Sequence, residues 1–130
     1  MSKKLLPPSI LTEKGLSLFK HDLTFRDLEL PIVEIETESL LWHLDMPVWE
    51  KDNTDDWNLT PREVLNKEKF TRNHQKKIAE VDLSFPILVT MYKERLVILD
   101  GIHRLCKAYS NKNETIKAKI IPSELLEVRY

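Results

Sequence analysis

The chain lacks several features that would assign it to a protein class at once. It has one cysteine among 130 residues, so no disulfide can form within the chain, and one cysteine with four histidines gives no spacing typical of a zinc site. Its apolar runs are too short for a membrane-spanning helix or a signal peptide. No repeat, low-complexity segment or linker divides the sequence. These absences predict a cytoplasmic, metal-free chain with no membrane segment and one folded domain.

The charge is nearly balanced overall but unevenly distributed. Residues 1–70 hold 9 Lys and Arg against 14 Asp and Glu, a charge of −5, whereas residues 71–130 hold 11 against 7, a charge of +4. This asymmetry favours an anionic ligand in the second half of the chain. The overall balance argues against non-specific coating of DNA, which needs a strongly basic face.

The pattern of apolar residues predicts an α+β domain over residues 30–130, preceded by an N-terminal arm over residues 1–29. Strands are expected at 30–36, 86–92, 95–99 and 115–121, and helices at 38–43, 61–67, 72–81, 102–111 and 124–127. Thr60, Pro61 and Glu63 form the pattern of a capping box. Lys93-Glu94 is expected as a tight hairpin turn, although it lacks the Gly or Asn that such turns favour.

The sequence also predicts which individual side chains cap a helix, face the core or face the solvent. Thr71 is expected to cap the helix at 72–81. The expected inward-facing residues of the two later helices are Ile78, Ala79, Val81, Leu105, Cys106, Ala108 and Tyr109. Lys117 and Lys119 alternate onto the solvent face of the last strand. The three tryptophans between positions 42 and 57 favour anchoring of a loop to the core over a base-stacking surface, and the acidic residues at 52, 55 and 56 are weak evidence for a divalent cation.

The segment 99–105 carries the clearest functional signal. An apolar run ends in Asp100-Gly101, and His103-Arg104 follows at the start of the expected helix. The first N–H groups of a helix have no partner within it, and the helix dipole places partial positive charge there. Glycine lets the backbone approach an anion closely. Two cationic residues at this end favour a bound phosphate over the simpler alternative, in which Asp100 is the N-cap of an ordinary helix.

This motif, in its position between a hairpin and a helix, resembles that of the ParB/sulfiredoxin-like superfamily. The resemblance covers roughly residues 30–122. It is carried by the run 98–105, by Ala108 one turn later, and by the Pro-initiated strand at 86–89. The resemblance implies a small mixed sheet packed with helices, in which the turn and the helix N-terminus bind nucleotide phosphates.

Carried over to this chain, the resemblance implies that Gly101, Ile102, His103 and Arg104 bind the phosphate. Asp100 is placed to act on a hydroxyl or water, or to hold a cation. In the related free-serine kinases, which match the Asp-Gly-x-His-Arg spelling best, a glutamate serves as base. Here Glu34, Glu36 and Glu38 are candidates that spacing does not separate, and Glu36 is taken with Asp100 and His103 as the catalytic set.

Two departures from the family exclude particular activities. Sulfiredoxins carry their catalytic cysteine directly before the motif histidine, where this chain has Ile102, and Cys106 is expected to face the core. Sulfiredoxin activity is therefore not expected. Partition proteins add a helix-turn-helix domain after this region, for which no residues follow in this sequence, so site-specific DNA clamping is not expected either.

Basic residues on the helix at 72–81 provide a further candidate surface. Several of Arg72, His74, Lys76 and Lys77 share one face and are expected to flank the same anion, with Arg72, His74 and Lys76 as the candidates, although a solvated helix face explains them at least as well.

The sequence therefore predicts a nucleotide-phosphate-binding domain, with phosphotransferase or NTPase activity as the enzymatic hypothesis. The expected ligand is ATP, ADP or CTP, with Mg²⁺ bridging its phosphates. The alternative is a DNA-associated module or a nuclease, with a nucleic acid or another protein as partner.

Overall fold

A computed structural model describes residues 29–54 and 57–122 of the chain. The expected arm at 1–29 and the expected helix at 124–127 therefore lie almost wholly outside the described residues. The described part is an α+β domain with a four-stranded mixed sheet. Its strands are β1 (Val33–Glu36), β2 (Ile87–Tyr92), β3 (Arg95–Asp100) and β4 (Thr115–Ile120), in the order β1-β4-β2-β3. Strands β2 and β4 are parallel, and the two outer pairs are antiparallel.

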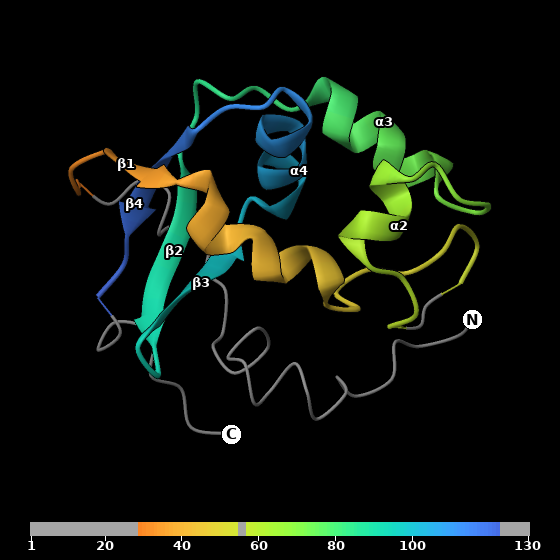
Figure 1. Ribbon diagram of the computed structural model, residues 1–130, viewed down its shortest axis with the longest axis horizontal. Coiled ribbons are helices and arrows are strands. Elements are labelled where there is room, and N and C mark those ends of the chain that lie inside the picture. The colour runs from red at the N-terminus through yellow and green to blue at the C-terminus, as the bar shows by residue number, and fades with distance from the viewer. Residues whose placement is uncertain (1–28, 55–56, 123–130) are drawn as a thin grey trace.

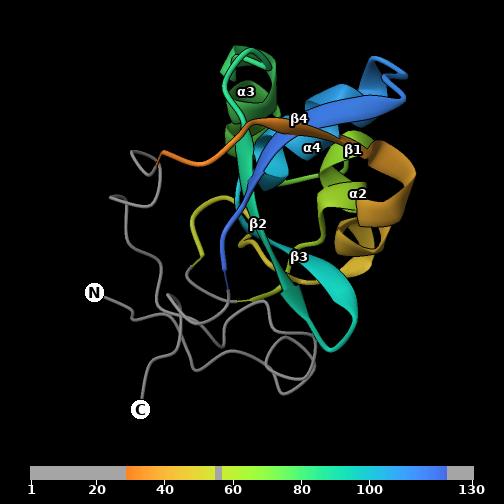
Figure 2. The same ribbon diagram turned by 90° about the vertical axis from the view of Figure 1, so that its left-hand side faces the viewer.

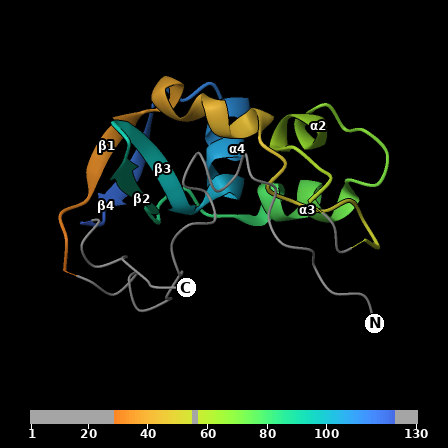
Figure 3. The same ribbon diagram turned by 90° about the horizontal axis from the view of Figure 1, so that it is seen from below.

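One 3₁₀ helix and three α-helices accompany the sheet. They are η2 (Thr37–Asp45), α2 (Pro61–Leu65), α3 (Arg72–Glu80) and α4 (Ile102–Ser110). Figures 1 and 3 show α4 between the sheet on one side and α2 and α3 on the other. The β2–β3 hairpin extends past the helices, as Figure 2 shows. None of these helices is long and apolar enough to cross a membrane, as far as the chain is described.

Local sequence explains where several elements begin. The capping box at Thr60 is present, because its hydroxyl accepts from the Glu63 N–H and the Glu63 carboxylate accepts from the Thr60 N–H. The tight hairpin is also confirmed. Lys93 and Glu94 both have positive φ, 48° and 64°, which is the conformation that a two-residue hairpin turn needs.

The cap of α3 differs from the expectation. Thr71 is the N-cap residue, but its hydroxyl donates to the Glu68 carbonyl and makes no cap bond. The Asp52 carboxylate takes that role, accepting from the backbone N–H groups of Arg72 and Asn73 at 3.1 and 3.3 Å. A carboxylate at a helix N-terminus is favoured by both hydrogen bonding and the helix dipole. The cap is 20 residues away in sequence, so local pattern could not identify it.

The sheet packs apolar side chains on both faces. One face, with Ile35, Val89 and Ile116, packs against the helices, and the other carries a smaller cluster of Leu88, Leu99 and Ile121. The expected inward positions are mostly confirmed for α4, where Leu105, Cys106 and Ala108 are fully buried. The expectation was wrong for Tyr109, which is 39% exposed, and for Ala79, which is exposed, because each lies on the solvent side of its helix.

Candidate functional site

The sheet register places the motif aspartate in a row of side chains across three strands. Leu88 on β2 pairs with Lys119 on β4 and with Asp100 on β3. Residues paired across strands point to the same face of a sheet. Lys119 and Asp100 therefore flank Leu88, with two strand spacings, about 10 Å, between their backbones. An opposite pair of charges thus lies at the end of the sheet where β2 begins.

A β-bulge brings Asp100 onto this face. Leu88 pairs with Asp100 and the next residue, Val89, pairs with Ile98, so Leu99 is an extra residue on β3. If β3 continued from Ile98 in strict alternation, Asp100 would lie on the helix side of the sheet with Ile98. Bulges commonly re-aim side chains beside functional sites, and this one aims the carboxylate into a hollow.

The hollow has a volume of about 500 Å³. It is lined by Ile32, Phe85, Pro86, Leu88, Asp100, Arg104 and Lys119. The hollow combines one carboxylate, two cations and an apolar surface that includes an exposed aromatic ring. Asp100 ends β3, directly before Gly101, and Arg104 lies in the first turn of α4. Because both residues line the hollow, the hollow lies beside the start of α4. We name it the Asp100 hollow.

Gly101 is required at this turn for reasons of packing. Its φ of 122° is rarely adopted by other residues, and a Cβ atom would lie 2.4 Å from Cγ2 of Ile87. It is also the N-cap residue of α4, and no side chain caps the helix. The alternative in which Asp100 is the N-cap is therefore wrong, because Asp100 ends β3. No acidic residue lies in the first turn of α4, so no carboxylate of that turn offsets its positive end.

Arg104 is held at the hollow by a hydrogen bond to a backbone carbonyl group of the segment before β2. Its Nε donates to the backbone oxygen of Asp82 at 3.0 Å. The guanidinium carbon lies 5.9 Å from the centroid of the Phe85 ring. One helical turn later, Lys107 Nζ donates to the carbonyls of Ala79 and Val81 at the C-terminal end of α3, where a cation is favoured. These bonds fix the side of α4 that faces α3.

His103 takes a different position from its neighbour Arg104. Its ring stacks on Trp49 at a centroid distance of 4.3 Å, and His74 stacks on the same tryptophan at 4.4 Å. His74 Nδ1 and His103 Nε2 are hydrogen-bonded at 3.0 Å. His103 does not line the Asp100 hollow. The histidine and arginine of the motif thus serve two separate environments.

Burial leaves both of these histidines uncharged at neutral pH. It lowers the pKa of His103 to about 4, and the neighbouring His74 and Lys77 act in the same direction. Burial also lowers the pKa of His74, against a raising effect from Glu50. Only Arg104 of the two motif cations therefore carries a positive charge at the start of α4. His103, which the sequence predicts as a second cation at this end of the helix, is neutral in the folded chain.

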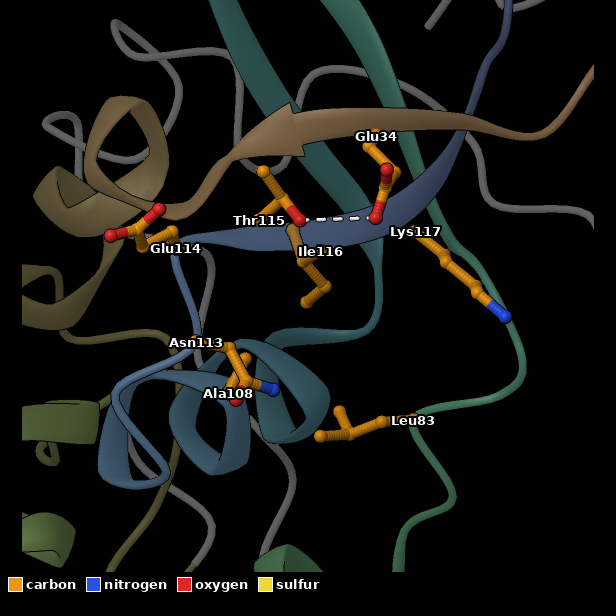
Figure 4. Close-up of a pocket in the computed structure, with 8 residues that line it drawn as sticks. All are labelled: Glu34, Leu83, Ala108, Asn113, Glu114, Thr115, Ile116 and Lys117. Carbon is orange, nitrogen blue, oxygen red and sulfur yellow. Dashed lines mark hydrogen bonds between the residues drawn. The ribbon is translucent and has the colours of Figure 1, made fainter.

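The other predicted site residues are dispersed. Glu36 lines a hollow with Tyr109 at the other end of α4, so the structure does not place it beside Asp100. Glu34 lines an adjacent hollow, where its carboxylate accepts from the Thr115 hydroxyl at 3.1 Å (Figure 4). Lys117 extends away from the same stretch of β4 in that view. The glutamates of β1 are thus not brought to the motif.

The basic residues of α3 are only partly brought to the motif. His74 contacts His103, as an uncharged ring, whereas Arg72 and Lys76 are exposed and do not line the Asp100 hollow. In the described ranges, no three His, Cys, Asp or Glu residues are grouped to hold a metal ion. Asp52 caps α3, while positions 55 and 56 lie outside the described residues.

Sequence reasoning missed two residues of the hollow. Phe85 was not singled out, and Lys119 was treated as a solvent-facing strand residue. Their proximity to Asp100 depends on the parallel pairing of β2 with β4, which no local pattern reports. Comparisons with protein-family models, with curated proteins and with solved structures find no match to this chain.

Proposed function

We propose that the Asp100 hollow binds the phosphate of a nucleotide, within a domain of the ParB/sulfiredoxin-like type. The observation that carries the proposal is the convergence of Arg104 and Lys119 beside the start of α4. Cationic side chains and the N-terminal end of a helix both favour an anion. Since Arg104 is already positioned by the Asp82 carbonyl, less side-chain entropy is lost when it binds a phosphate.

The proposal assigns separate roles to the remaining motif residues. Gly101 shapes the turn, and the backbone N–H groups of Ile102 and His103 lie in the first turn of α4, where such groups bind anions. The His103 side chain, stacked on Trp49, positions the helix and carries no charge to the ligand. Of the four predicted positions, Ile102, His103 and Arg104 thus stay at the phosphate, Gly101 shapes the turn, and the charge contribution comes from Arg104 and Lys119.

The enzymatic form of the proposal is phosphoryl transfer or hydrolysis with Asp100 as the acting carboxylate. Asp100 is the one carboxylate among the residues that line the hollow. A single carboxylate suits Mg²⁺, which commonly takes one or two protein ligands and completes its shell with phosphate oxygens and water. When bound, Mg²⁺ would neutralise charge on the phosphates. Asp100 would hold that ion or accept a proton from the attacking hydroxyl or water.

Ligand-induced stabilisation tests the proposal. Thermal unfolding would be followed with inorganic phosphate, ATP, ADP and CTP, each with and without Mg²⁺, since a ligand that binds the folded state raises Tm. Lys119→Ala should weaken binding about tenfold or more, the value of one charge-assisted contact of roughly 1.5–3 kcal/mol. Lys117→Ala is the matched control, because Lys117 lies on the same strand face and lines a different hollow.

The result that would overturn the proposal is a Tm unchanged by every ligand, or an equal response in Lys119→Ala and Lys117→Ala. The enzymatic form has its own test. Asp100→Asn should abolish phosphate release or transfer while binding of inorganic phosphate, which the proposal assigns to Arg104 and Lys119, is retained. Salt-sensitive binding of plain DNA with no nucleotide response would favour the nucleic-acid alternative instead.

A further inference from the structure

The Asp100 hollow includes a large apolar side chain that is exposed and yet anchored. Phe85 is 59% exposed, and it lines the hollow beside Arg104. Its backbone N–H donates to the carbonyl of Asp82 at 3.3 Å, and Arg104 Nε donates to the same carbonyl oxygen at 3.0 Å. One acceptor thus fixes both the aromatic residue and the cation beside it.

The residues on either side of Phe85 restrict it further. Pro86 follows it directly and limits its backbone to extended conformations. Before it, the Asp82 carboxylate accepts from the Ser84 N–H at 2.8 Å, which closes the turn that leads to Phe85. A side chain on so constrained a backbone remains at the hollow and is available to a ligand.

Resting on the proposed function, we infer that Phe85 is the stacking surface for a nucleobase and that the ligand is a nucleoside phosphate. Every nucleobase has a flat face that stacks on an aromatic ring, and such stacking is largely independent of sequence. The Arg104 guanidinium, 5.9 Å from the ring centroid, places the proposed phosphate ligand next to the proposed base surface. A bare phosphate or a sugar phosphate would use the cations and leave the ring exposed.

The rest of the hollow fits a ligand with one apolar and one charged end. Ile32, which is 54% exposed, and Pro86 extend the apolar lining, while Asp100 and Lys119 supply charges. Asp100 can accept hydrogen bonds from ribose hydroxyls, a contact that inorganic phosphate does not offer. The volume of about 500 Å³ is also within the range typical of sites for small organic ligands.

A ligand series separates stacking from phosphate binding. Affinities of the full chain would be measured by calorimetry for inorganic phosphate, ribose 5-phosphate, AMP and CMP. The nucleotides should bind at least about fivefold more tightly than ribose 5-phosphate, because stacking one base is worth roughly 1–3 kcal/mol. Phe85→Leu should remove that advantage and leave the ribose 5-phosphate affinity unchanged, whereas Phe85→Tyr should keep it. Phe70→Leu is the control, since Phe70 is exposed to a similar extent, 62%, and lines another hollow.

The outcomes distinguish the two proposals. If ribose 5-phosphate binds as tightly as the nucleotides and Phe85→Leu changes neither, the stacking role is wrong and the phosphate site stands. If Phe85→Leu weakens inorganic phosphate and nucleotides equally, Phe85 only shapes the hollow, and the inference is also wrong. If no phosphate compound binds wild type, the proposed function and the inference fail together.

Discussion

The stability of this domain should decrease sharply in mild acid because of His43. This histidine is fully buried, and both of its ring nitrogens are hydrogen-bonded to backbone groups. Nδ1 bonds to the Leu40 carbonyl at 2.7 Å and is therefore the protonated nitrogen, while Nε2 accepts from the Ile98 N–H at 3.0 Å. A second proton on Nε2 would face that N–H donor. Burial accordingly lowers the pKa of His43 to about 4, from an ordinary value of 6.5.

The direction and size of this loss of stability follow from the difference in the pKa of His43 between the folded and the unfolded chain. The unfolded chain takes up the proton near pH 6.5 and the folded chain near pH 4, so acid favours the unfolded state. The contribution of a neutral His43 is fully present above about pH 6.5 and is lost as the pH falls towards 4. Integration over this window gives a loss of about 2 kcal/mol by pH 5 and about 3 kcal/mol by pH 4. For a domain with a typical total of about 5–15 kcal/mol, this is a large fraction.

Urea unfolding followed by circular dichroism between pH 7.5 and 4 would measure this loss. His43→Gln cannot titrate in this range, so the stability difference between wild type and variant isolates His43 from carboxylates that protonate in both proteins. The variant should be less stable at pH 7.5 by about 1–3 kcal/mol, because a buried backbone group loses its partner. That difference should shrink by about 3 kcal/mol at pH 4. Parallel stability curves for the two proteins would refute the reasoning.

Substitutions at two further positions, Gly101 and Asp52, test the elements that support the site. Gly101→Ala should destabilise the domain by about 2–5 kcal/mol in urea unfolding, from backbone strain at positive φ together with overlap against Ile87; a loss below about 1 kcal/mol would contradict this packing. Asp52→Ala should cost about 1 kcal/mol by removing the cap of α3, whereas Asp52→Asn, which retains an acceptor oxygen, should cost less. Equal losses for the two Asp52 variants would argue against the capping role.

Elements that depend on residues close together in the chain were predictable from the sequence. The capping box at Thr60, the hairpin at Lys93 and the alternation of β4 each depend on residues within a few positions of one another. Their physical causes are hydrogen bonds within one turn or the two-residue period of a strand. The strand at 30–36 was expected too early, since β1 begins at Val33, and the helix at 38–43 is a 3₁₀ helix over Thr37–Asp45.

The candidate site was less predictable because its geometry depends on pairing between distant segments. Asp100 and Arg104 were identified, but Lys119 joins them only through the parallel register with Leu88, and the bulge at Leu99 decides which face Asp100 occupies. The stacking of His74 and His103 on Trp49 brings three distant segments together, and burial there lowers the pKa of both histidines, so that two expected cations are neutral rings. Charge in a sequence is assigned from ordinary pKa values, and burial revises it.

The first turn of α4 therefore presents two side chains to two different surroundings. Successive residues of an α-helix are about 100° apart around the axis, so the side chains of His103 and Arg104 point in different directions. His103 packs with Trp49 and His74 and fixes the helix to its neighbours, while Arg104 is held by the Asp82 carbonyl beside Phe85. The part of the motif that holds the helix in place is thus separate from the part that faces the hollow. Because these contacts fix the helix without a ligand, Arg104 and Phe85 would already be in place for the proposed anion, which lowers the cost of ordering them on binding.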